Sequence, residues 1–236
     1  MNKKPTVSIG IPAHNEAKNI KNLLESIFKQ ECYLFDLEKI YIICDGCTDL
    51  TAEIVKTLAK KYSFICLKDD GNRLGKTARL NELYRMNNSD YLLTLDGDIV
   101  LGTVTEIDKL VKVALESKSE VIAAYQVPVE VLGFIEKILY ANDRFWTEVR
   151  LHINNGNYIQ NLQGSATLLA GHFARQLIYP TDIPCDQMYL YISASRKNTF
   201  TFSQKSCVIY RTLGTISDWH KLNKRIASEH FHIRRI

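Results

Sequence analysis

Acidic and polar side chains follow three apolar segments of the sequence, in a pattern that could hold a cation and a phosphorylated ligand. They occupy residues 12–16, 45–49 and 96–98. In Asp96-Gly97-Asp98, two aspartates flank one glycine. Such a pair suits Mg²⁺ or Mn²⁺, because hard carboxylate oxygens bind these ions and the glycine lets the backbone turn closely. Substrate phosphates would complete the coordination, and the cation would offset the charge that develops as a diphosphate leaves.

Each of these loops also has a purely structural explanation when it is taken alone. Asn15 or Thr48 could cap a helix, Asp49 could favour a helix N-terminus, and residues 96–98 could form a turn. Capping does not explain why carboxylates follow three different strand-like segments. We therefore expect the three loops to meet at one edge of a sheet.

A fourth loop adds positive charge and glycines. It runs Asp70-Gly71-Asn72-Arg73-Leu74-Gly75-Lys76, and a helical pattern begins directly after it. Glycines give this loop conformational freedom, and the backbone N–H groups at a helix start can receive a phosphate. The glycine spacing differs from that of a Walker loop. The loop therefore predicts a contact with a phosphate group, in a site that is not of the Walker type.

The elements that must position these loops alternate between strand and helix. Strand-like runs cover residues 7–12, 40–44, 64–67 and 91–95, and helical apolar stripes cover 20–28, 55–62, 80–84 and 107–115. This alternation predicts an α/β fold with a mostly parallel central sheet flanked by helices on both faces. In such sheets ligands bind beyond the carboxyl ends of the strands, where the acidic loops fall.

The second half of the chain has a different rhythm. A further strand is predicted at 121–125, one long helix between 131 and 149, and an apolar run at 166–170. No proline-rich linker, internal repeat or low-complexity tract divides the chain. We therefore predict a single domain over residues 1–236, with a smaller sub-region in its second half.

Composition excludes several classes of protein. The 236 residues are 46% hydrophobic and 24% charged, which is ordinary for a folded domain and unlike disordered or coiled-coil chains. A net charge of +4 is too mild for a nucleic-acid binder, and no run of about 20 apolar residues could span a bilayer. The six cysteines, without a visible export signal, favour reduced thiols and a cytoplasmic location.

Taken together, the loops resemble the successive motifs of glycosyltransferase family 2. The matching segments, in the order of that family, are Ile11-Pro12-Ala13-His14-Asn15-Glu16, Asp45-Gly46-Cys47-Thr48-Asp49-Leu50-Thr51, Asn72-Arg73-Leu74-Gly75-Lys76-Thr77-Ala78-Arg79-Leu80-Asn81 and Asp96-Gly97-Asp98. The resemblance implies a Rossmann-like GT-A fold and transfer of a sugar from a nucleotide-diphosphate donor, with inversion at the anomeric carbon. It further implies that residues 1–120 bind the nucleotide sugar and that 121–236 bind the acceptor.

The same resemblance implies roles for individual donor-side residues. Those expected to bind the donor are Pro12, Asn15, Glu16, Asp45, Lys76, Arg79, Asp96 and Gly164. Within this set, Glu16 would lie near the ribose and Asp45 near the base. Lys76 and Arg79 would lie near the base or the phosphates. Asp98 would bind the metal, Mg²⁺ or Mn²⁺.

The second half resembles the family less closely, and its motifs concern transfer to the acceptor. Gln163-Gly164-Ser165-Ala166 looks like a small-residue loop that contacts donor sugar and acceptor, and Cys185-Asp186 stands where the family usually has Glu-Asp. Asp186 is therefore the implied general base, which takes the proton of the attacking hydroxyl. Asp182 competes for this role, and placement of Asp186 at a helix start is the structural alternative.

The function that we expect is inverting transfer of a sugar to a hydroxyl of a glycan or lipid-linked glycan, as in cell-surface polysaccharide or glycoconjugate synthesis. A nucleotidyltransferase of similar fold would instead release pyrophosphate from a nucleoside triphosphate. A non-catalytic subunit would bind a nucleotide sugar without transfer, although the presence of both Asp98 and Asp186 weighs against it.

The C-terminal segment is basic and partly apolar. Residues 226–236 combine Phe231, Ile233 and Ile236 with Arg234 and Arg235. This composition makes the segment a candidate for peripheral contact with an anionic membrane at its cytosolic face, and a solvated terminal helix is the alternative.

Overall fold

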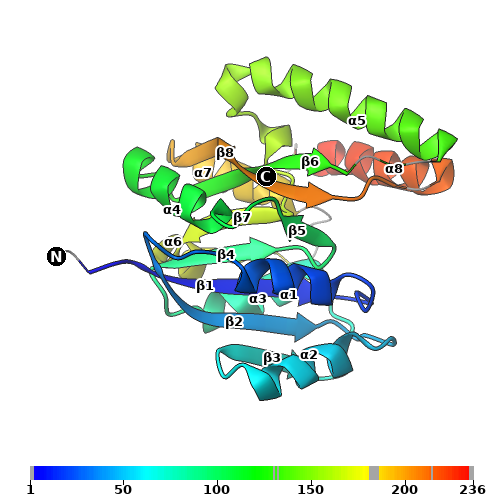
Figure 1. Cartoon of the computed structure of the whole chain (residues 1–236). Coiled ribbons are helices and arrows are strands. Elements are labelled where there is room, and N and C mark those ends of the chain that lie inside the picture. The colour runs from blue at the N-terminus through cyan, green and yellow to red at the C-terminus, as the bar shows by residue number, and fades with distance from the viewer. Residues whose placement is uncertain (1–2, 130, 132, 181–185, 214, 234–236) are drawn as a thin grey trace.

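The computed structural model describes residues 3–129, 131, 133–180, 186–213 and 215–233 (Figure 1). The strands are β1 (Thr6–Ala13), β2 (Asp36–Cys44), β3 (Ile65–Asp69), β4 (Tyr91–Leu95), β5 (Ile99–Leu101), β6 (Val121–Pro128), β7 (Ala166–Ala170) and β8 (Phe200–Tyr210). The α-helices are α1 (Ile20–Phe28), α2 (Thr51–Lys61), α3 (Lys76–Met86), α4 (Glu106–Ser117), α5 (Phe134–His152), α6 (Gly171–Gln176), α7 (Asp186–Ser195) and α8 (Ile216–Ile233).

The strands of the described residues form one 8-stranded sheet in the order β3-β2-β1-β4-β7-β6-β8-β5. The first four are mutually parallel, which confirms the prediction from the alternating strand and helix patterns. Beyond β4 the sheet is mixed, because β7 pairs antiparallel with both β4 and β6 while β6 and β8 run parallel. Most strands beyond β4 come from the second half of the chain, but β5 of the first half pairs antiparallel with β8 at the end of the sheet.

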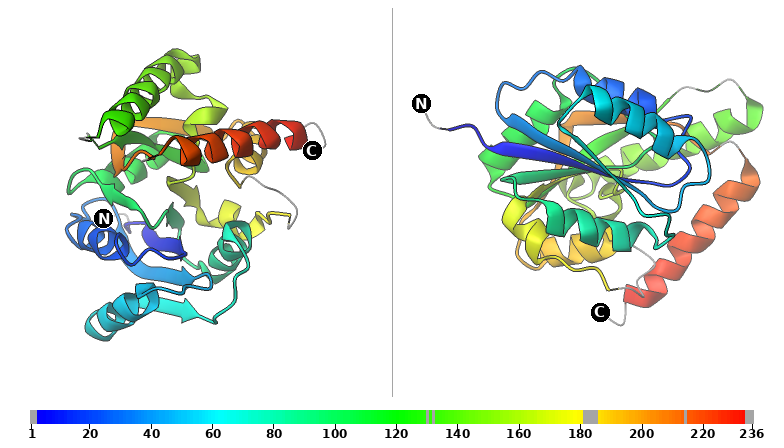
Figure 2. Two further views of the ribbon diagram at one scale, coloured as in Figure 1. Left: turned by 90° about the vertical axis from the view of Figure 1, so that its right-hand side faces the viewer. Right: turned by 90° about the horizontal axis from the view of Figure 1, so that it is seen from below.

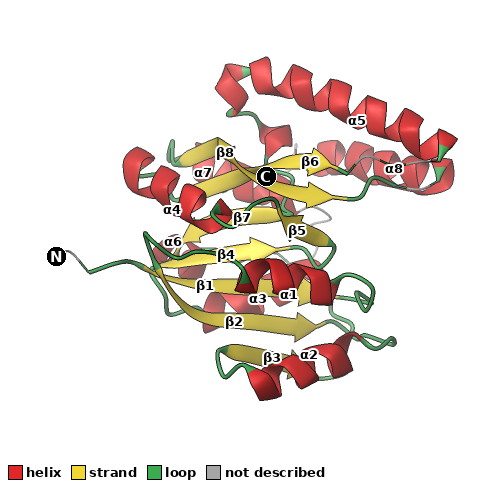
Figure 3. Cartoon of the chain, viewed as in Figure 1, coloured by secondary structure: helices red, strands yellow, loops and turns green. Residues whose placement is uncertain are grey.

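Helices cover both faces of the sheet, as predicted. One apolar core joins the sheet to α1, α2 and α4 through residues such as Leu23, Val55 and Leu110. A second core joins the opposite face to α3, α6 and α7 through residues such as Leu83 and Phe173. Figure 2 shows these two helical layers, and Figure 3 shows the strands between them.

Helix α5 lies along the outside of the sheet beside β6 (Figure 1). It buries Leu139 and Thr147, but much of the apolar pattern that predicted it faces outward, with Trp146 51% exposed. Polar residues make the inward contacts instead, since Arg211 donates to Glu136 at 2.9 Å and Tyr210 to Asp143 at 3.3 Å. No helix among the described residues has the length and apolar character needed to cross a membrane.

Candidate functional site

Three strand ends place the acidic loops side by side. In Figure 1 the arrows of β1, β2 and β4 point to the same edge of the sheet. The first two loops are joined there, because Thr48 N donates to Asn15 Oδ1 at 2.8 Å and Ala17 N donates to Asp49 Oδ2 at 3.0 Å. Asn15 adopts a left-handed backbone conformation with φ of 56°. The predicted meeting of the loops is thus confirmed, and Asn15 takes part in joining them.

Glu16 connects the first loop to the third. Its side chain packs on Gly97, where a Cβ would lie 2.6 Å from Glu16 Cγ, and Asn19 Nδ2 donates to its Oε2 at 2.8 Å. Burial raises the pKa of Glu16, and the nearby carboxylates of Asp98 and Asp96 raise it further, against the effect of the Asn19 hydrogen bond. Three carboxylates therefore lie close enough to repel one another, which a bound cation would relieve.

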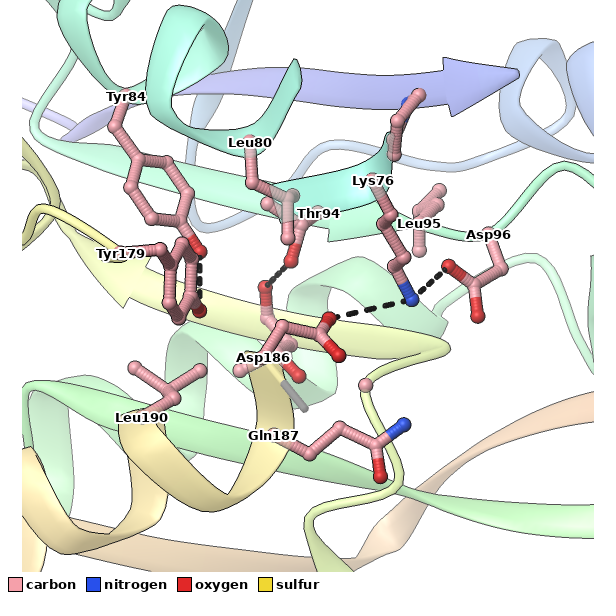
Figure 4. Close-up of a pocket in the computed structure, with 13 residues that line it drawn as sticks. Lys76, Leu80, Tyr84, Thr94, Leu95, Asp96, Tyr179, Asp186, Gln187 and Leu190 are labelled. Atoms are coloured by element: carbon pink, nitrogen blue, oxygen red, sulfur yellow. Dashed lines mark hydrogen bonds and ion pairs between the residues drawn. The ribbon is translucent and has the colours of Figure 1, made fainter. Parts of the chain in front are cut away.

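Lys76 links two carboxylates that come from separate parts of the chain. Its Nζ lies 2.7 Å from Asp96 Oδ1, just after β4, and 3.4 Å from Asp186 Oδ2, at the first residue of α7. Figure 4 shows the lysine between them. Burial works against the charge of Lys76, but the two carboxylates outweigh it and raise the pKa of the lysine. Lys76 therefore remains an ammonium group over the physiological pH range.

Asp96 has a raised pKa even though it contacts the Lys76 ammonium. Burial raises the pKa of its carboxyl, and Asp186 and Asp98 add to the rise, while the Lys76 ammonium opposes them. Lys76, Asp96 and Asp186 line a small pocket. Its other lining residues are Pro12, Leu80, Tyr84, Thr94, Leu95, Gly164, Thr167, Tyr179, Gln187 and Leu190. Pro12, Lys76, Asp96, Gly164 and Asp186, all predicted to belong to the site, thus share one pocket.

Asp45 and Arg79 pair with each other beneath the site. The Asp45 side chain is 3% exposed and that of Arg79 is fully buried, with Nε 3.0 Å from Asp45 Oδ1. Asp45 also accepts hydrogen bonds from Leu74 N at 2.7 Å and Gly75 N at 3.0 Å, and from Arg73 Nη1. Burial raises the pKa of Asp45, but these donors more than compensate and lower it overall. A contact between Asp45 and a nucleotide base stays a prediction.

The remaining N–H groups of Arg79 also have partners in the chain. Nη2 donates to Asp70 Oδ1 at 2.7 Å and to Asn72 O at 2.5 Å, and Nη1 donates to Asp70 and Glu82. The guanidinium therefore fixes the loop 70–75 from below. In this arrangement every N–H group of Arg79 already has a partner, so none is free for a phosphate. The predicted direct contact between Arg79 and the nucleotide sugar stays a prediction.

Gly164 approaches the start of α7 closely. It has a φ of 70°, and a Cβ there would lie 2.8 Å from Gln187 Cγ. Gln187 Nε2 donates to Gln163 O at 2.5 Å, so the residue after Asp186 fastens α7 to the small-residue loop. Next to this glycine, Ser165 Oγ and Thr167 Oγ1 are buried without a hydrogen-bond partner among the described residues. Asp182 and Cys185 lie outside the described residues.

The carboxylates around Asp98 fit a divalent cation whose coordination is completed by oxygen atoms of the substrate. Asp98 is exposed beside Asp96 and Glu16, and the described residues contain no cluster of three or more His, Cys, Asp or Glu side chains arranged as a metal cage. Mg²⁺ is usually bound in this way, by one or two carboxylates together with phosphate oxygens. Asp98 with Asp96 therefore suits the predicted ion.

Some residues of the site were not predicted individually, although the basic loop that contains Arg73 was expected to contact a phosphate. Arg73, Gln187 and the hydrogen-bonded pair Tyr84 and Tyr179, whose hydroxyls are 3.1 Å apart, all shape the site. Gln187 is next to Asp186 in the sequence, so adjacency could have suggested it. Tyr179 comes from the segment after α6 and reaches the pocket only through the tertiary fold.

Solved structures identify the class of fold. The mannosyltransferase PcManGT from Pyrobaculum calidifontis, in complex with GDP-Man and Mn²⁺, superposes with a TM-score of 0.73 at 16% identity, over 97% of this chain and 62% of that one. Residues 1–349 of S. aureus TarS, in complex with UDP, superpose with a TM-score of 0.65 at 18% identity, over 95% and 65%. The chain has the GT-A glycosyltransferase fold, as the resemblance implied.

Sequence comparison then defines the family. The model of "Glycosyl transferase family 2" matches residues 8–174, so the chain belongs to glycosyltransferase family 2. Probable glycosyltransferase YdaM of Bacillus subtilis is 33% identical over 101 residues, or 42% of this chain and 24% of that protein. Poly-beta-1,6-N-acetyl-D-glucosamine synthase of Staphylococcus aureus (strain COL) is 28% identical over 109 residues, or 43% and 26%. The chain thus spans about a quarter of the length of these curated relatives.

Proposed function

We propose that the protein is an inverting, metal-dependent glycosyltransferase that moves a sugar from a nucleotide-diphosphate donor to a hydroxyl of a glycan or lipid-linked glycan. The observation that carries the proposal is the meeting of Asp96, Lys76 and Asp186 at the carboxyl edge of the sheet, with Nζ 2.7 and 3.4 Å from the two carboxylates. This arrangement sets a candidate base, Asp186, next to an ammonium group that suits a diphosphate. Membership of glycosyltransferase family 2 and the UDP and GDP-Man complexes of two structural neighbours support it.

Each part of the site has a role in this reaction. Asp98 with Asp96 would hold the Mg²⁺ or Mn²⁺, which when bound offsets charge on the leaving diphosphate. Asp186 takes the proton from the acceptor hydroxyl as its oxygen bonds to the anomeric carbon. The bond from that carbon to the diphosphate breaks on the opposite face, and its electron pair leaves with the nucleotide. The hydroxyl of Thr167, which lines the pocket and has no hydrogen-bond partner among the described residues, could pair with a hydroxyl of a sugar.

A panel of nucleotide sugars tests the function. Thermal stability is measured with each compound in the presence of Mn²⁺, because a ligand that binds the native form raises its melting temperature. We expect a donor to stabilise the protein and, with an acceptor, to release a nucleoside diphosphate. Release of pyrophosphate from a nucleoside triphosphate would instead indicate a nucleotidyltransferase, and absence of stabilisation by every nucleotide sugar tested would contradict the proposal.

Asp98→Ala should remove the metal dependence of donor binding. Binding of UDP or GDP is measured in the presence of Mn²⁺, before and after addition of EDTA. In the unmodified protein, EDTA should weaken binding by about tenfold or more, the effect of losing a charge-assisted contact. In Asp98→Ala, binding should be weak from the start and EDTA should change it little. Asp36→Ala is the matched control, since it removes an exposed aspartate at the start of β2 on the opposite edge of the sheet. Equal EDTA sensitivity in Asp98→Ala and Asp36→Ala would contradict the assignment.

Gly97→Ala should displace Glu16 without changing any charge. An alanine Cβ would lie 2.6 Å from Glu16 Cγ, well inside the separation of about 3.5–4.0 Å that carbon atoms prefer. Gly97 is not in a left-handed conformation, so the backbone itself tolerates alanine. If Glu16 binds the ribose, nucleoside diphosphate binding weakens by about tenfold, the loss of one hydrogen bond to a charged group. Glu16→Ala should then show the same loss of nucleoside diphosphate affinity, measured by calorimetry. An unchanged affinity in Gly97→Ala would contradict a contact between Glu16 and the ribose.

A further inference from the structure

The Lys76 ammonium lies between two carboxylates that come from different halves of the chain. Its side chain, at the start of α3, is 35% exposed and contacts Asp96 and Asp186. Asp186 lies in the second half of the chain, so this ion pair joins the two halves at the edge where the donor is expected. A lysine has a flexible four-carbon stem and three N–H donors, and it can therefore change partners without moving the backbone.

The two contacts of Lys76 are unequal. The Nζ to Asp96 distance of 2.7 Å is that of a charge-assisted hydrogen bond, whereas the 3.4 Å to Asp186 is longer than such bonds usually are. The pair with Asp186 is therefore the weaker of the two. It nevertheless occupies Oδ2 of the proposed base, which leaves the other oxygen for an acceptor hydroxyl.

Other basic side chains near this edge are less suited to a change of partner. Arg79 is fully buried and engaged with Asp45, Asp70 and Glu82. Arg73 is 56% exposed on the loop and paired with Asp45. Lys76 combines exposure with a position inside the pocket that Asp96, Gly164 and Asp186 line. Of these three cations, Lys76 is thus the one that lines the pocket beside Asp186.

We infer that Lys76 is a positioning residue that exchanges Asp186 for the diphosphate of the donor. Before the donor binds, Lys76 holds the carboxylate of Asp186. The diphosphate takes over the ammonium, while the shorter contact to Asp96 keeps the stem in place. Asp186 is then released toward the acceptor. This inference rests on the proposed function, and it predicts that the donor binds before the acceptor becomes reactive.

The exchange predicts an energetic coupling that binding measurements can detect. If Asp186 competes with the diphosphate for Lys76, Asp186→Asn should bind UDP or GDP in the presence of Mn²⁺ more tightly. We expect a gain of about 3- to 30-fold, within the range of coupling between contacting residues. With Lys76→Met in addition, the same replacement of Asp186 should change the affinity less than about twofold, because the shared cation is gone.

A four-variant calorimetric cycle of Lys76→Met, Asp186→Asn, their combination and the unmodified protein tests the inference. Lys76→Arg, which keeps the charge, should restore part of the coupling, and Lys76→Gln replaces Lys76→Met if that variant does not fold. Glu120→Gln is the matched control. Glu120 contacts His172 at 2.6 Å, also across the two halves but at the far edge of the sheet, and its loss should leave nucleotide affinity unchanged.

The outcomes separate the inference from the proposed function. If Asp186→Asn tightens binding equally with and without Lys76, the carboxylate acts by direct repulsion of the diphosphate and the exchange is wrong. If it has no effect while Lys76 is present, the exchange is also wrong, although nucleotide binding itself still agrees with the proposed function. If no nucleoside diphosphate binds the unmodified protein, the proposed function fails instead.

Discussion

Arg79→Met is expected to lower the free energy of unfolding by about 3–5 kcal/mol, the range found when one partner of a buried ion pair is removed. The Arg79 side chain is fully buried, and its guanidinium contacts Asp45, Asp70 and Glu82. Without it, Asp45 remains a buried carboxylate with only part of its compensation. Methionine keeps much of the side-chain length, so the loss reports charge and hydrogen bonding more than volume. Urea unfolding monitored by circular dichroism measures the change.

Arg73→Met provides a closely matched control, because Arg73 pairs with the same carboxylate from the surface. Its side chain is 56% exposed, and an exposed ion pair contributes about 0–1 kcal/mol. Combining Asp45→Asn with Arg79→Met should recover part of the lost stability, since the uncompensated charge is then absent. Equal destabilisation by Arg73→Met and Arg79→Met would show that burial of the guanidinium does not decide its contribution.

The sequence was sufficient to predict the strands that carry the donor side of the site. β1, β2 and β4 are short apolar runs followed at once by polar loops, and a strand buried on both faces requires such a run. β8 was missed because Ser203, Gln204, Lys205 and Ser206 interrupt its apolar pattern. The structure has a register shift there, between the pairs Ala124–Ser203 and Tyr125–Cys207, so the pattern and the pairing are both irregular at the same point.

The types of residue in the site could be predicted, but their partners could not. A carboxylate after a strand is visible locally, whereas the pairing of Asp45 with Arg79 or of Lys76 with Asp186 depends on packing across the sheet and between the two halves. This matters for interpretation of Arg79. A basic residue in a donor motif predicts a contact with phosphate, while the burial of this guanidinium among three carboxylates favours a role in holding the loop 70–75.

The outward apolar side of α5 shows a similar limit. Helical spacing predicted the helix, but it did not say which side of the helix faces the core. In the structure the inward side includes Glu136 and Asp143, which bond to Arg211 and Tyr210, while Ile138 and Trp146 are exposed. Periodicity reports that two sides of a helix differ, and only the tertiary arrangement determines which side is covered.

Asp186→Asn is expected to reduce sugar transfer by about 10²- to 10⁴-fold, the usual contribution of a general base. Asparagine fits the same space and can still accept a hydrogen bond from Lys76, but it cannot take a proton from the acceptor hydroxyl. Nucleoside diphosphate binding should not be lost, because the contacts to the nucleotide come from other residues, and the exchange at Lys76 predicts that it becomes tighter. The two measurements are therefore initial rates of transfer, at saturating donor and acceptor, and calorimetric binding of UDP or GDP with Mn²⁺.

The comparison with Asp182 makes this prediction specific to one carboxylate. Asp182 is four residues away and competes for the role of base by sequence, whereas Asp186 contacts Lys76 and lines the pocket with Asp96. If Asp186 is the base, Asp182→Asn lowers transfer far less than Asp186→Asn, and the exposed Asp36→Asn does not lower it. A large loss in Asp182→Asn with transfer preserved in Asp186→Asn would move the base to Asp182. In that event the contact between Lys76 and Asp186 would act only to join the two halves of the site.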